Sequence, residues 1–348
     1  MPKRIEIVLL NWNGAAHLRR FLPSVVASAA TAGAGVTVAD NGSTDDSAAL
    51  LAREFPSVRL IRLDRNYGFA EGYNRALAEV EADYWLLLNT DVEVAEGWIE
   101  PLVETLDRNP DVAVVAPKLR AVEAPDCFEY AGAAGGYIDF LGYPFCRGRI
   151  LQRVERDEGQ YDDARDLFWV SGAAFCCRAE VFRALGGFDA AFFAHMEEID
   201  LCWRMQLAGW RVRIVPQSRV WHLGGGTLQT GSPAKTFYNH RNNLAMLFKC
   251  APPVQRCVVA LLRPLLDAAA GLSYLVQGRP AHAWAVVRAY ASFLRSHPRL
   301  ARQRRAIRGA RKAESHYIYK GSVVLRALAG RRTFGRMMPG GGTQEPGK

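Results

Sequence analysis

The sequence predicts an α/β protein with a mostly parallel sheet, helices on both faces of that sheet, and a C-terminal helical module. Three observations predict this fold. Apolar runs of strand length alternate with helical segments from residue 4 to about 115, as in successive βαβ units. The 348 residues, of which 49% are hydrophobic, are enough to bury one large core. From residue 233 onward the pattern is helical throughout.

The elements of the first part follow from apolar periodicity and from residues typical of helix ends. Strands are expected at residues 5–10, 36–39, 58–63, 84–88 and 112–115, with helices between them at 17–30, 43–54, 68–80 and 95–108. Ser43-Thr44-Asp45-Asp46 resembles a capping box, which is why the second helix is expected to start there.

The middle of the chain is less regular. Residues 120–165 are rich in glycine and aromatic residues, and we expect a hairpin or flap. Further elements are then expected in the order strand 168–174, helix 178–185, helix 197–209, strand 211–215, strand 219–221 and a flexible loop at 224–226. We therefore expect a first domain over 1–232, divided at about residue 118, a helical module over 233–335 and a disordered tail over 336–348.

Cysteine usage and the N-terminus both indicate an intracellular protein. The seven cysteines are scattered and no pair has C-x-x-C spacing, which disfavours a disulfide framework or a zinc site. The first apolar run, Ile5–Leu10, is too short for a signal peptide and has the length of a strand. We expect a cytoplasmic protein.

The charge is concentrated at the C-terminal end. The chain carries a net charge of +9, whereas residues 253–348 hold 18 Lys and Arg against 3 Asp and Glu. Such a region suits a phosphate-rich partner, either nucleic acid or an anionic membrane surface. The apolar segment Val254–Val276 is interrupted by Arg263 and Asp267, so a surface-lying amphipathic helix is favoured over a membrane span. A soluble helical cap with solvated basic residues is the alternative.

Polar residues follow the ends of four consecutive strands, where ligands bind in such sheets. These segments are Asn11-Trp12-Asn13, Asp40-Asn41-Gly42, Asn66-Tyr67-Gly68 and Asn89-Thr90-Asp91. Alone, Asp40-Asn41-Gly42 is also typical of an ordinary turn, and the glycines after Asn66 are also typical of helix–sheet packing. Together the four segments predict a binding site for a nucleotide, with Asp40 as an acceptor for a base or ribose donor group.

Two acidic clusters and a histidine suggest metal and acid–base chemistry. Asn89-Thr90-Asp91 resembles a D-x-D motif whose first acid is Asn, and Asp91 would bind Mg²⁺ or Mn²⁺; an Asx-turn is the alternative. His222 follows a strand and is either structural or a second ligand beside Asp91. Glu197, Glu198 and Asp200 crowd one helical turn. Repulsion between neighbouring carboxylates would raise one pKa towards that of a general base, whereas Asp200 has a helix ion-pair partner in Arg204.

In these motifs the chain resembles the inverting family 2 glycosyltransferases with the GT-A fold, and within them the bacterial rhamnosyltransferases of cell-surface polysaccharide synthesis. The matching segments, in the family's order over about residues 4–250, are Val8–Gly14, Val38–Asp45, Asn66–Asn74, Leu87–Asp91, Trp169–Ala173, Gly187–Asp189, Glu197–Arg204 and Val220–His222.

The resemblance implies a role for particular residues. It makes Asp91 and His222 metal ligands for Mg²⁺ or Mn²⁺ and places Glu198 at the general-base position, with Glu197 as the alternative because this position is Glu where the family has Asp. Glu197 and Asp200 complete the expected catalytic group. The expected donor-binding residues are Asn11, Asn13, Asp40, Asn66, Gly68, Asn74, Asn89 and Thr90.

The resemblance also implies the reaction. We expect transfer of a sugar, with rhamnose from dTDP-rhamnose as the best candidate, from a nucleotide-sugar donor to a lipid-linked or saccharide acceptor. A UDP-hexose donor is the first alternative, and a non-catalytic nucleotide- or nucleic-acid-binding protein is the second. The acidic residues at Asp91 and Glu198 would repel a polyanion, so no nucleic-acid partner is expected. Because the C-terminal module is basic and the acceptor is expected to be lipid-linked, we expect a peripheral protein at the inner face of the membrane.

Overall fold

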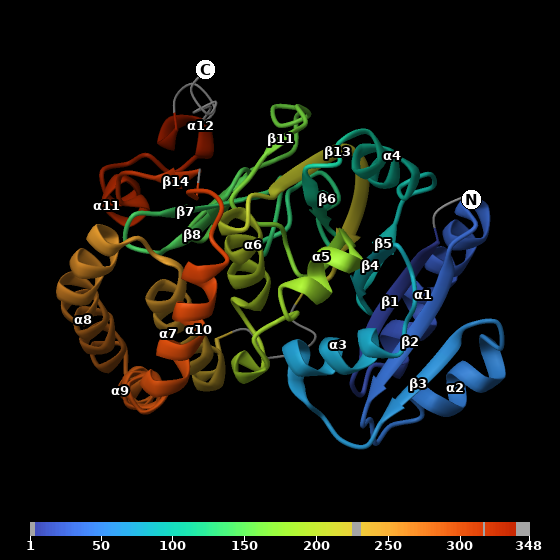
Figure 1. The fold of residues 1–348 in the computed structure, drawn as a ribbon, viewed down its shortest axis with the longest axis horizontal. Coiled ribbons are helices and arrows are strands. Elements are labelled where there is room, and N and C mark those ends of the chain that lie inside the picture. Colours follow the sequence, from blue (N-terminus) through green and yellow to red (C-terminus); the bar gives the residue numbers. More distant parts are fainter. Residues whose placement is uncertain (1–3, 225–230, 316, 339–348) are drawn as a thin grey trace.

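The computed structural model describes residues 4–224, 231–315 and 317–338. Its central sheet has the strand order β11-β13-β6-β12-β4-β1-β2-β3, with β5 paired to β13 (Figure 1). The strands are β1 (Ile5–Asn11), β2 (Gly35–Asn41), β3 (Arg59–Leu63), β4 (Tyr84–Asn89), β5 (Val92–Val94), β6 (Val112–Ala121), β11 (Arg165–Asp166), β12 (Ala174–Arg178) and β13 (Arg211–His222). The neighbours β3, β2, β1 and β4 are parallel, whereas β12 runs antiparallel between β4 and β6.

Helices cover both faces of this sheet, as predicted. They are α1 (Ala15–Ala32), α2 (Ser47–Glu54), α3 (Gly68–Ala78), α4 (Glu100–Arg108), α5 (Ala179–Ala184) and α6 (Glu197–Leu207). Successive strand residues point to opposite faces, so Ile7 and Leu9 pack in one hydrophobic core and Val8 packs in the other. The parallel strands therefore bury both faces, which explains why they read as continuous apolar runs.

Several expected boundaries are wrong. The capping-box segment at 43–46 does not start the second helix, because α2 begins at Ser47. The helix expected from residue 95 begins at Glu100 instead, as α4, after a turn at Gly97. The strand expected at 168–174 lies at Ala174–Arg178 instead. Its place is taken by a segment bound to a second sheet, where the Trp169 Nε1–H donates to the Tyr137 carbonyl. The two strands expected around residues 211–221 form one strand, β13, with a register shift between Val215 and Arg219.

The glycine-rich middle segment forms a second sheet with the order β10-β9-β8-β7-β14. Its strands are β7 (Gly136–Asp139), β8 (Pro144–Cys146), β9 (Arg149–Ile150), β10 (Arg153–Val154) and β14 (Ile318–Tyr319). The expected hairpin is therefore present within a larger sheet. Because β14 comes from the C-terminal region, the prediction of a purely helical pattern after residue 233 is wrong at this point.

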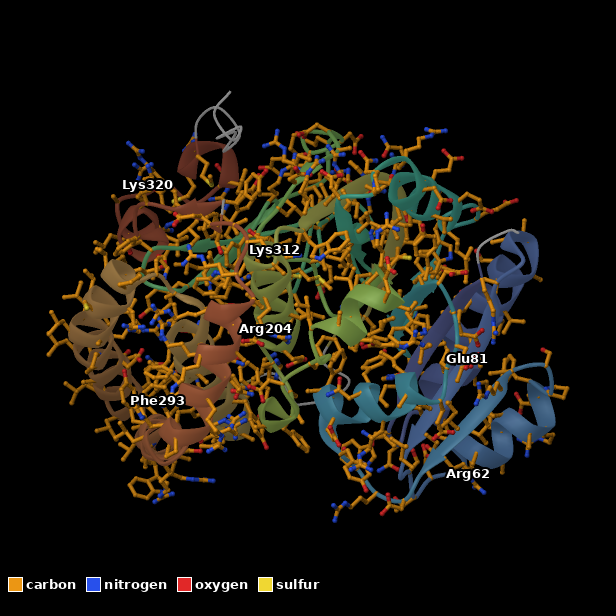
Figure 2. The ribbon with its side chains drawn as sticks, in the orientation of Figure 1. Arg62, Glu81, Arg204, Phe293, Lys312 and Lys320 are labelled. Carbon is orange, nitrogen blue, oxygen red and sulfur yellow. The ribbon has the colours of Figure 1, made fainter. Side chains whose placement is uncertain are left out.

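The remaining helices pack against one side of the sheets (Figure 1). They are α7 (Pro233–Cys250), α8 (Pro253–Val276), α9 (Pro280–Arg295), α10 (His297–Gly309), α11 (Val323–Leu328) and α12 (Phe334–Met337). Phe293 of α9 lies among them (Figure 2). Its ring packs edge-on to that of Phe248 of α7, with ring centroids 6.1 Å apart. The expected tail begins within α12, and residues 339–348 lie outside the described residues, as does most of the loop expected at 224–226.

Helix α8 is long and apolar enough to cross a membrane by length and composition, with a mean hydropathy of 1.5. Two charged side chains of this helix are bound by other parts of the protein. Arg263 donates to the Leu141 carbonyl and the Asn243 side chain, and Asp267 accepts from Tyr290. Both charges are buried on the side that faces the protein, which leaves the apolar residues on the other side.

Candidate functional site

The polar ends of the parallel strands meet at one edge of the sheet, as the sequence predicts. A cavity of about 220 Å³ lies there. The expected donor-binding residues that line it are Asn13, Asn66, Gly68, Asn89 and Thr90, together with Asp91. Trp12, His17 and Phe193 also line this cavity. The cavity offers amide groups and aromatic surface, which suit a nucleoside.

Three expected donor-binding residues do not line this cavity. The buried Asn11 donates from Nδ2 to Asp40 Oδ1 at 3.2 Å and to Ser43 Oγ at 3.2 Å. Asn74 is held by Phe188, since its Oδ1 accepts from the Phe188 N–H and its Nδ2 donates to the Phe188 carbonyl, both at 2.9 Å. Asn11 and Asn74 thus link neighbouring segments of the fold. Asp40 lies behind Asn11, which donates a hydrogen bond to its carboxylate.

Asp91 and His222 face each other across the end of the sheet. Asp91 follows β4, and His222 ends β13, which brings residues far apart in sequence to 3.2 Å between Asp91 Oδ1 and His222 Nε2. On its other side His222 Nδ1 lies 3.3 Å from Glu129 Oε1. Burial lowers the pKa of His222, but the two carboxylates outweigh it and raise the pKa to about 10. The same contact with His222 outweighs burial at Asp91 and lowers the pKa of its carboxyl.

This pair fits a hard divalent cation, which on binding would displace the proton from His222 Nε2. An oxygen and an imidazole nitrogen lie together at the end of the sheet, and a carboxylate on the second ring nitrogen is the usual arrangement around a metal-binding histidine. The described residues contain no group of three or more His, Cys, Asp or Glu side chains able to hold a metal. Two protein ligands would therefore leave the other positions to water and to a ligand's phosphates, as is common for Mg²⁺.

Glu197 and Glu198 lie in a second, smaller cavity that adjoins the first. This pocket of about 140 Å³ is also lined by Asn89, Asp91 and His222, so it joins the carboxylates to the proposed metal pair. The Oε2 atoms of Glu197 and Glu198 are buried without a hydrogen-bond partner in the described part of the chain. Burial raises the pKa of Glu198 to about 7. Burial and the charge of Glu198 raise the pKa of Glu197 well above its ordinary value.

Asp200 lies outside this pocket, unlike its two neighbours. Its carboxylate accepts from Arg204 Nε at 2.8 Å and lies 2.8 Å from Lys249 Nζ. Lys249 also binds Asp189 Oδ2 at 2.7 Å, and Arg299 binds Asp189 Oδ1 at 2.7 Å. Asp200 therefore belongs to an ionic network that ties α6 to the C-terminal helices, and its catalytic role stays a prediction from the sequence.

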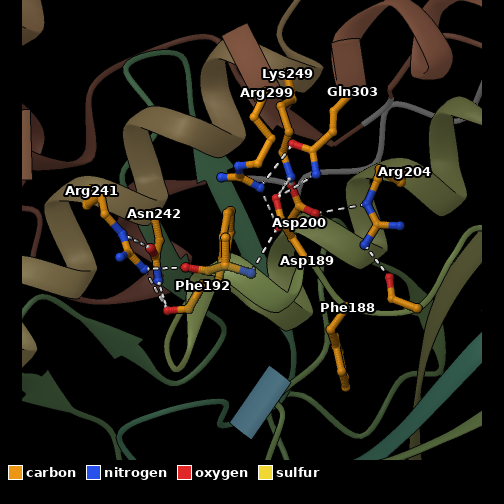
Figure 3. Close-up of polar contacts among 12 residues, drawn as sticks. Phe188, Asp189, Phe192, Asp200, Arg204, Arg241, Asn242, Lys249, Arg299 and Gln303 are labelled. Atoms are coloured by element: carbon orange, nitrogen blue, oxygen red, sulfur yellow. Dashed lines mark hydrogen bonds and ion pairs between the residues drawn. The ribbon is translucent and has the colours of Figure 1, made fainter. Parts of the chain in front are cut away.

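The segment that leads into α6 has a strained backbone. Phe193, His195 and Met196 all have positive φ angles, of 66°, 70° and 72°, which are unfavourable for residues other than glycine. The buried Asn242 of α7 holds this segment, with Nδ2 at 3.0, 2.9 and 2.7 Å from the carbonyl oxygens of residues 192, 194 and 195 (Figure 3). A side chain of the C-terminal module therefore sets the backbone immediately before Glu197 and Glu198.

We expect Asn242→Ala to lower kcat about tenfold or more while donor KM stays near the wild-type value, because the carboxylates shift when their supporting amide is lost. Asn243→Ala is a matched control. Asn243 is also buried on α7, but it binds the Gly142 carbonyl and Arg263, away from the carboxylates. Thermal unfolding and steady-state kinetics of both variants provide the measurement. Equal losses of kcat in the two variants would show that Asn242 supports stability alone.

Four residues of this site were not predicted from the sequence. Glu129 lies in the irregular middle segment, and Asn242 lies on a helix that has no motif around it. His195 and Lys235 line the carboxylate pocket, and burial together with the charge of Lys235 lowers the pKa of His195 to about 4. His195 could have been found from its place beside the two glutamates, whereas the other three carry no local signal.

Comparisons with known proteins agree with this geometry. The model of glycosyl transferase family 2 matches residues 6–181, and that of glycosyl transferase family group 2 matches residues 150–243. The N-acetylglucosaminyl-diphospho-decaprenol L-rhamnosyltransferase of Mycobacterium tuberculosis is 30% identical over 240 residues, which span 64% of this chain and 76% of that protein.

Solved structures resemble the fold at low sequence identity. GalNAc-T7, solved with UDP, GalNAc and Mn²⁺, gives a TM-score of 0.57 at 18% identity over 71% of this chain and 48% of that one. The mannosyltransferase PcManGT of Pyrobaculum calidifontis was solved with GDP-Man and Mn²⁺. It gives a TM-score of 0.51 at 15% identity over 89% of this chain and 86% of that one. The family match covers half of the chain, and the fold agrees with it. The chain therefore belongs to glycosyltransferase family 2 and is a glycosyltransferase with the GT-A fold.

Proposed function

We propose that this enzyme transfers rhamnose from dTDP-rhamnose, with inversion, to a saccharide carried on a polyprenyl diphosphate. The observation that carries the mechanism is that Asp91 lines both the nucleoside cavity and the pocket of Glu198. A sugar whose diphosphate lies at Asp91 would therefore have its anomeric carbon close to the Glu198 carboxylate. We assign the nucleotide-binding half to residues 1–118, the acceptor half to 119–232 and the helical module to 233–335.

In the proposed reaction Glu198 removes the proton from the acceptor hydroxyl as its oxygen attacks the anomeric carbon. The bond from that carbon to the diphosphate breaks in the same step, so one displacement inverts the centre without a covalent intermediate. Asp91 and His222 would hold Mg²⁺ or Mn²⁺, which neutralises charge on the leaving diphosphate when bound. The apolar walls of the pocket, including Phe69, exclude water that would compete with the acceptor.

The donor and acceptor assignments rest on the rhamnosyltransferase relative. A panel of dTDP-rhamnose and UDP-hexoses, with an N-acetylglucosaminyl-diphospho-polyprenol as acceptor, tests them by release of the nucleoside diphosphate. We expect the highest kcat/KM with dTDP-rhamnose. A UDP-hexose that is used more efficiently would replace the proposed donor and leave the mechanism unchanged.

We also propose that the enzyme is attached to the inner face of the membrane through α8 and its neighbours. Leu261, Leu265, Leu272 and Val276 of α8 are 73%, 68%, 64% and 89% exposed, and α9 adds the exposed Trp284. An apolar surface of this kind beside a strongly basic segment matches an anionic lipid surface. Helices α8 and α9 lie at the opposite end of the molecule from β1–β3 (Figure 1), so the nucleotide half remains free in solution.

The double substitution Leu265→Gln with Leu272→Gln is expected to lower the fraction of protein that sediments with anionic vesicles about tenfold or more. Burying one leucine side chain contributes roughly 1.5–3 kcal/mol, and two are removed. Leu151→Gln, at a residue 41% exposed in the turn after β9, is the matched control. Binding should also weaken in neutral vesicles and in high salt. Sedimentation that is unaffected by the double substitution would contradict attachment through α8.

A further inference from the structure

A third cavity, of about 780 Å³, lies next to the pocket of Glu198. It shares Ala131, His222 and Lys235 with that pocket, so the two spaces are neighbours. Its other walls come from residues 121–131, from residues around β10, from the segments that follow β13 and precede α7, from the beginning of α7, and from the junction of α8 and α9. We call it the basic cavity because of the side chains that line it.

Cationic side chains dominate the charge of the basic cavity. Lys235 and Arg279 line it, and neither makes an ion pair in the part of the chain that the structure describes. Glu129 is the one carboxylate among the described lining residues, and it is already in contact with His222. Neither α7 nor α9, which both begin at the cavity, has an acidic residue in its first turn. The cavity therefore presents two cations that make no ion pair among the described residues, and Glu129 is near enough to Lys235 to balance part of its charge.

The guanidinium of Arg279 is held in a fixed orientation. Its Nη2 donates to His282 Nε2 at 2.8 Å and to the Gly231 carbonyl at 3.1 Å. Arg279 is always protonated, so His282 must accept through Nε2 and carry its proton on Nδ1, which lies 2.8 Å from Thr236 Oγ1. These contacts use one terminal nitrogen and leave Nε and Nη1 of Arg279 without a partner among the described residues. A forked, fixed guanidinium of this kind suits a phosphate.

The basic cavity also adjoins the apolar surface of α8. Tyr274 lines the cavity, and its near neighbours Leu272, Leu275 and Val276 are exposed on the same helix. A ligand with phosphates in the cavity and a long hydrocarbon chain could therefore continue along α8 to the lipid. The position of the cavity beside the pocket of Glu198 would place a sugar attached to those phosphates within reach of the base.

We infer that the basic cavity binds the diphosphate of a polyprenyl-diphosphate-linked acceptor, with Lys235 and Arg279 as its phosphate-binding residues. This inference rests on the proposed function, because it concerns the acceptor of the same reaction. The inference gives the enzyme two diphosphate-binding sites, one for the donor and one for the acceptor. The donor diphosphate lies at Asp91 and His222, and the acceptor diphosphate lies at Lys235 and Arg279, on the other side of the reacting sugar.

The test is direct binding of a short-chain prenyl diphosphate to the full-length enzyme by calorimetry, without any sugar donor. Lys235→Gln and Arg279→Gln are each expected to weaken binding about tenfold or more, the scale of a charge-assisted hydrogen bond. Arg288→Gln removes the same charge from α9 at a residue that does not line the cavity, and it should bind as the wild type does. The corresponding prenyl alcohol should bind at least about tenfold more weakly than the diphosphate.

A saturating nucleoside diphosphate with Mn²⁺ distinguishes the two diphosphate sites, and the prenyl diphosphate should still bind in its presence. Displacement by the nucleotide, equal binding of the alcohol, or equal weakening in Arg288→Gln would each overturn the inference. Lys235→Gln keeps the test informative if Arg279→Gln does not fold, since the Lys235 side chain makes no hydrogen bond in the described chain. The measurement involves no sugar transfer, so a wrong donor or a wrong base leaves its outcome unchanged.

Discussion

Glu198→Gln is expected to lower kcat by roughly 10²–10⁴-fold, which is the range of general-base catalysis. Glutamine keeps the shape of the side chain and removes the proton acceptor. Donor affinity should change little, because Glu198 lines the smaller pocket and does not line the nucleoside cavity. Donor binding can be measured with the nucleoside diphosphate alone, and turnover by release of that product.

The pH dependence provides a second test of the same residue. Burial raises the pKa of Glu198 to about 7, and the base must be deprotonated to act. We therefore expect log kcat/KM in the wild type to rise with pH below about 7 and to level off above it. The residual activity of Glu198→Gln should lack this limb. If Glu197→Gln is the inactive variant and Glu198→Gln keeps the limb, the base is Glu197.

The parallel half of the sheet and its ligand-binding edge could be predicted from the sequence because their determinants are local. Buried parallel strands read as apolar runs, and their polar ends must meet at one edge whatever the loops do. Asn13, Asn66 and Asn89 therefore line one cavity as expected. The i, i+4 spacing of Asp200 and Arg204 likewise predicted an ion pair, which the structure contains.

The support of the carboxylates could not be predicted, because it depends on contacts between distant segments. Asn242 is more than forty residues from the carbonyls that it holds, and Glu129 is 93 residues from His222. The positive φ angles at Phe193, His195 and Met196 have no sequence signal, since none of these residues is a glycine. The C-terminal module, expected to be a membrane-bound platform or a soluble helical cap, also contributes β14 to the second sheet and Lys249 to the network around Asp200.

Asp91→Ala is expected to reduce turnover at least about a hundredfold, since metal stabilisation of a leaving diphosphate contributes several kcal/mol. The variant should also lose the increase in nucleoside-diphosphate affinity that Mn²⁺ or Mg²⁺ gives the wild type. Both effects follow from its position, buried at the end of β4 and 3.2 Å from His222. Titration of the nucleoside diphosphate with and without the cation separates lost metal binding from a general loss of activity.

Removing the cation from the wild type supplies the control for this variant. Excess chelator should abolish turnover, and added Mn²⁺ should restore it in the wild type but not in Asp91→Ala. Folding must be checked by thermal unfolding, because the substitution leaves His222 with one carboxylate neighbour, Glu129, in place of two. Full turnover in chelator would show that Asp91 and His222 form an ion pair that supports the fold and that they hold no catalytic metal. The charge of the leaving diphosphate would then have to be balanced by cationic side chains other than Lys235, which is assigned to the acceptor diphosphate.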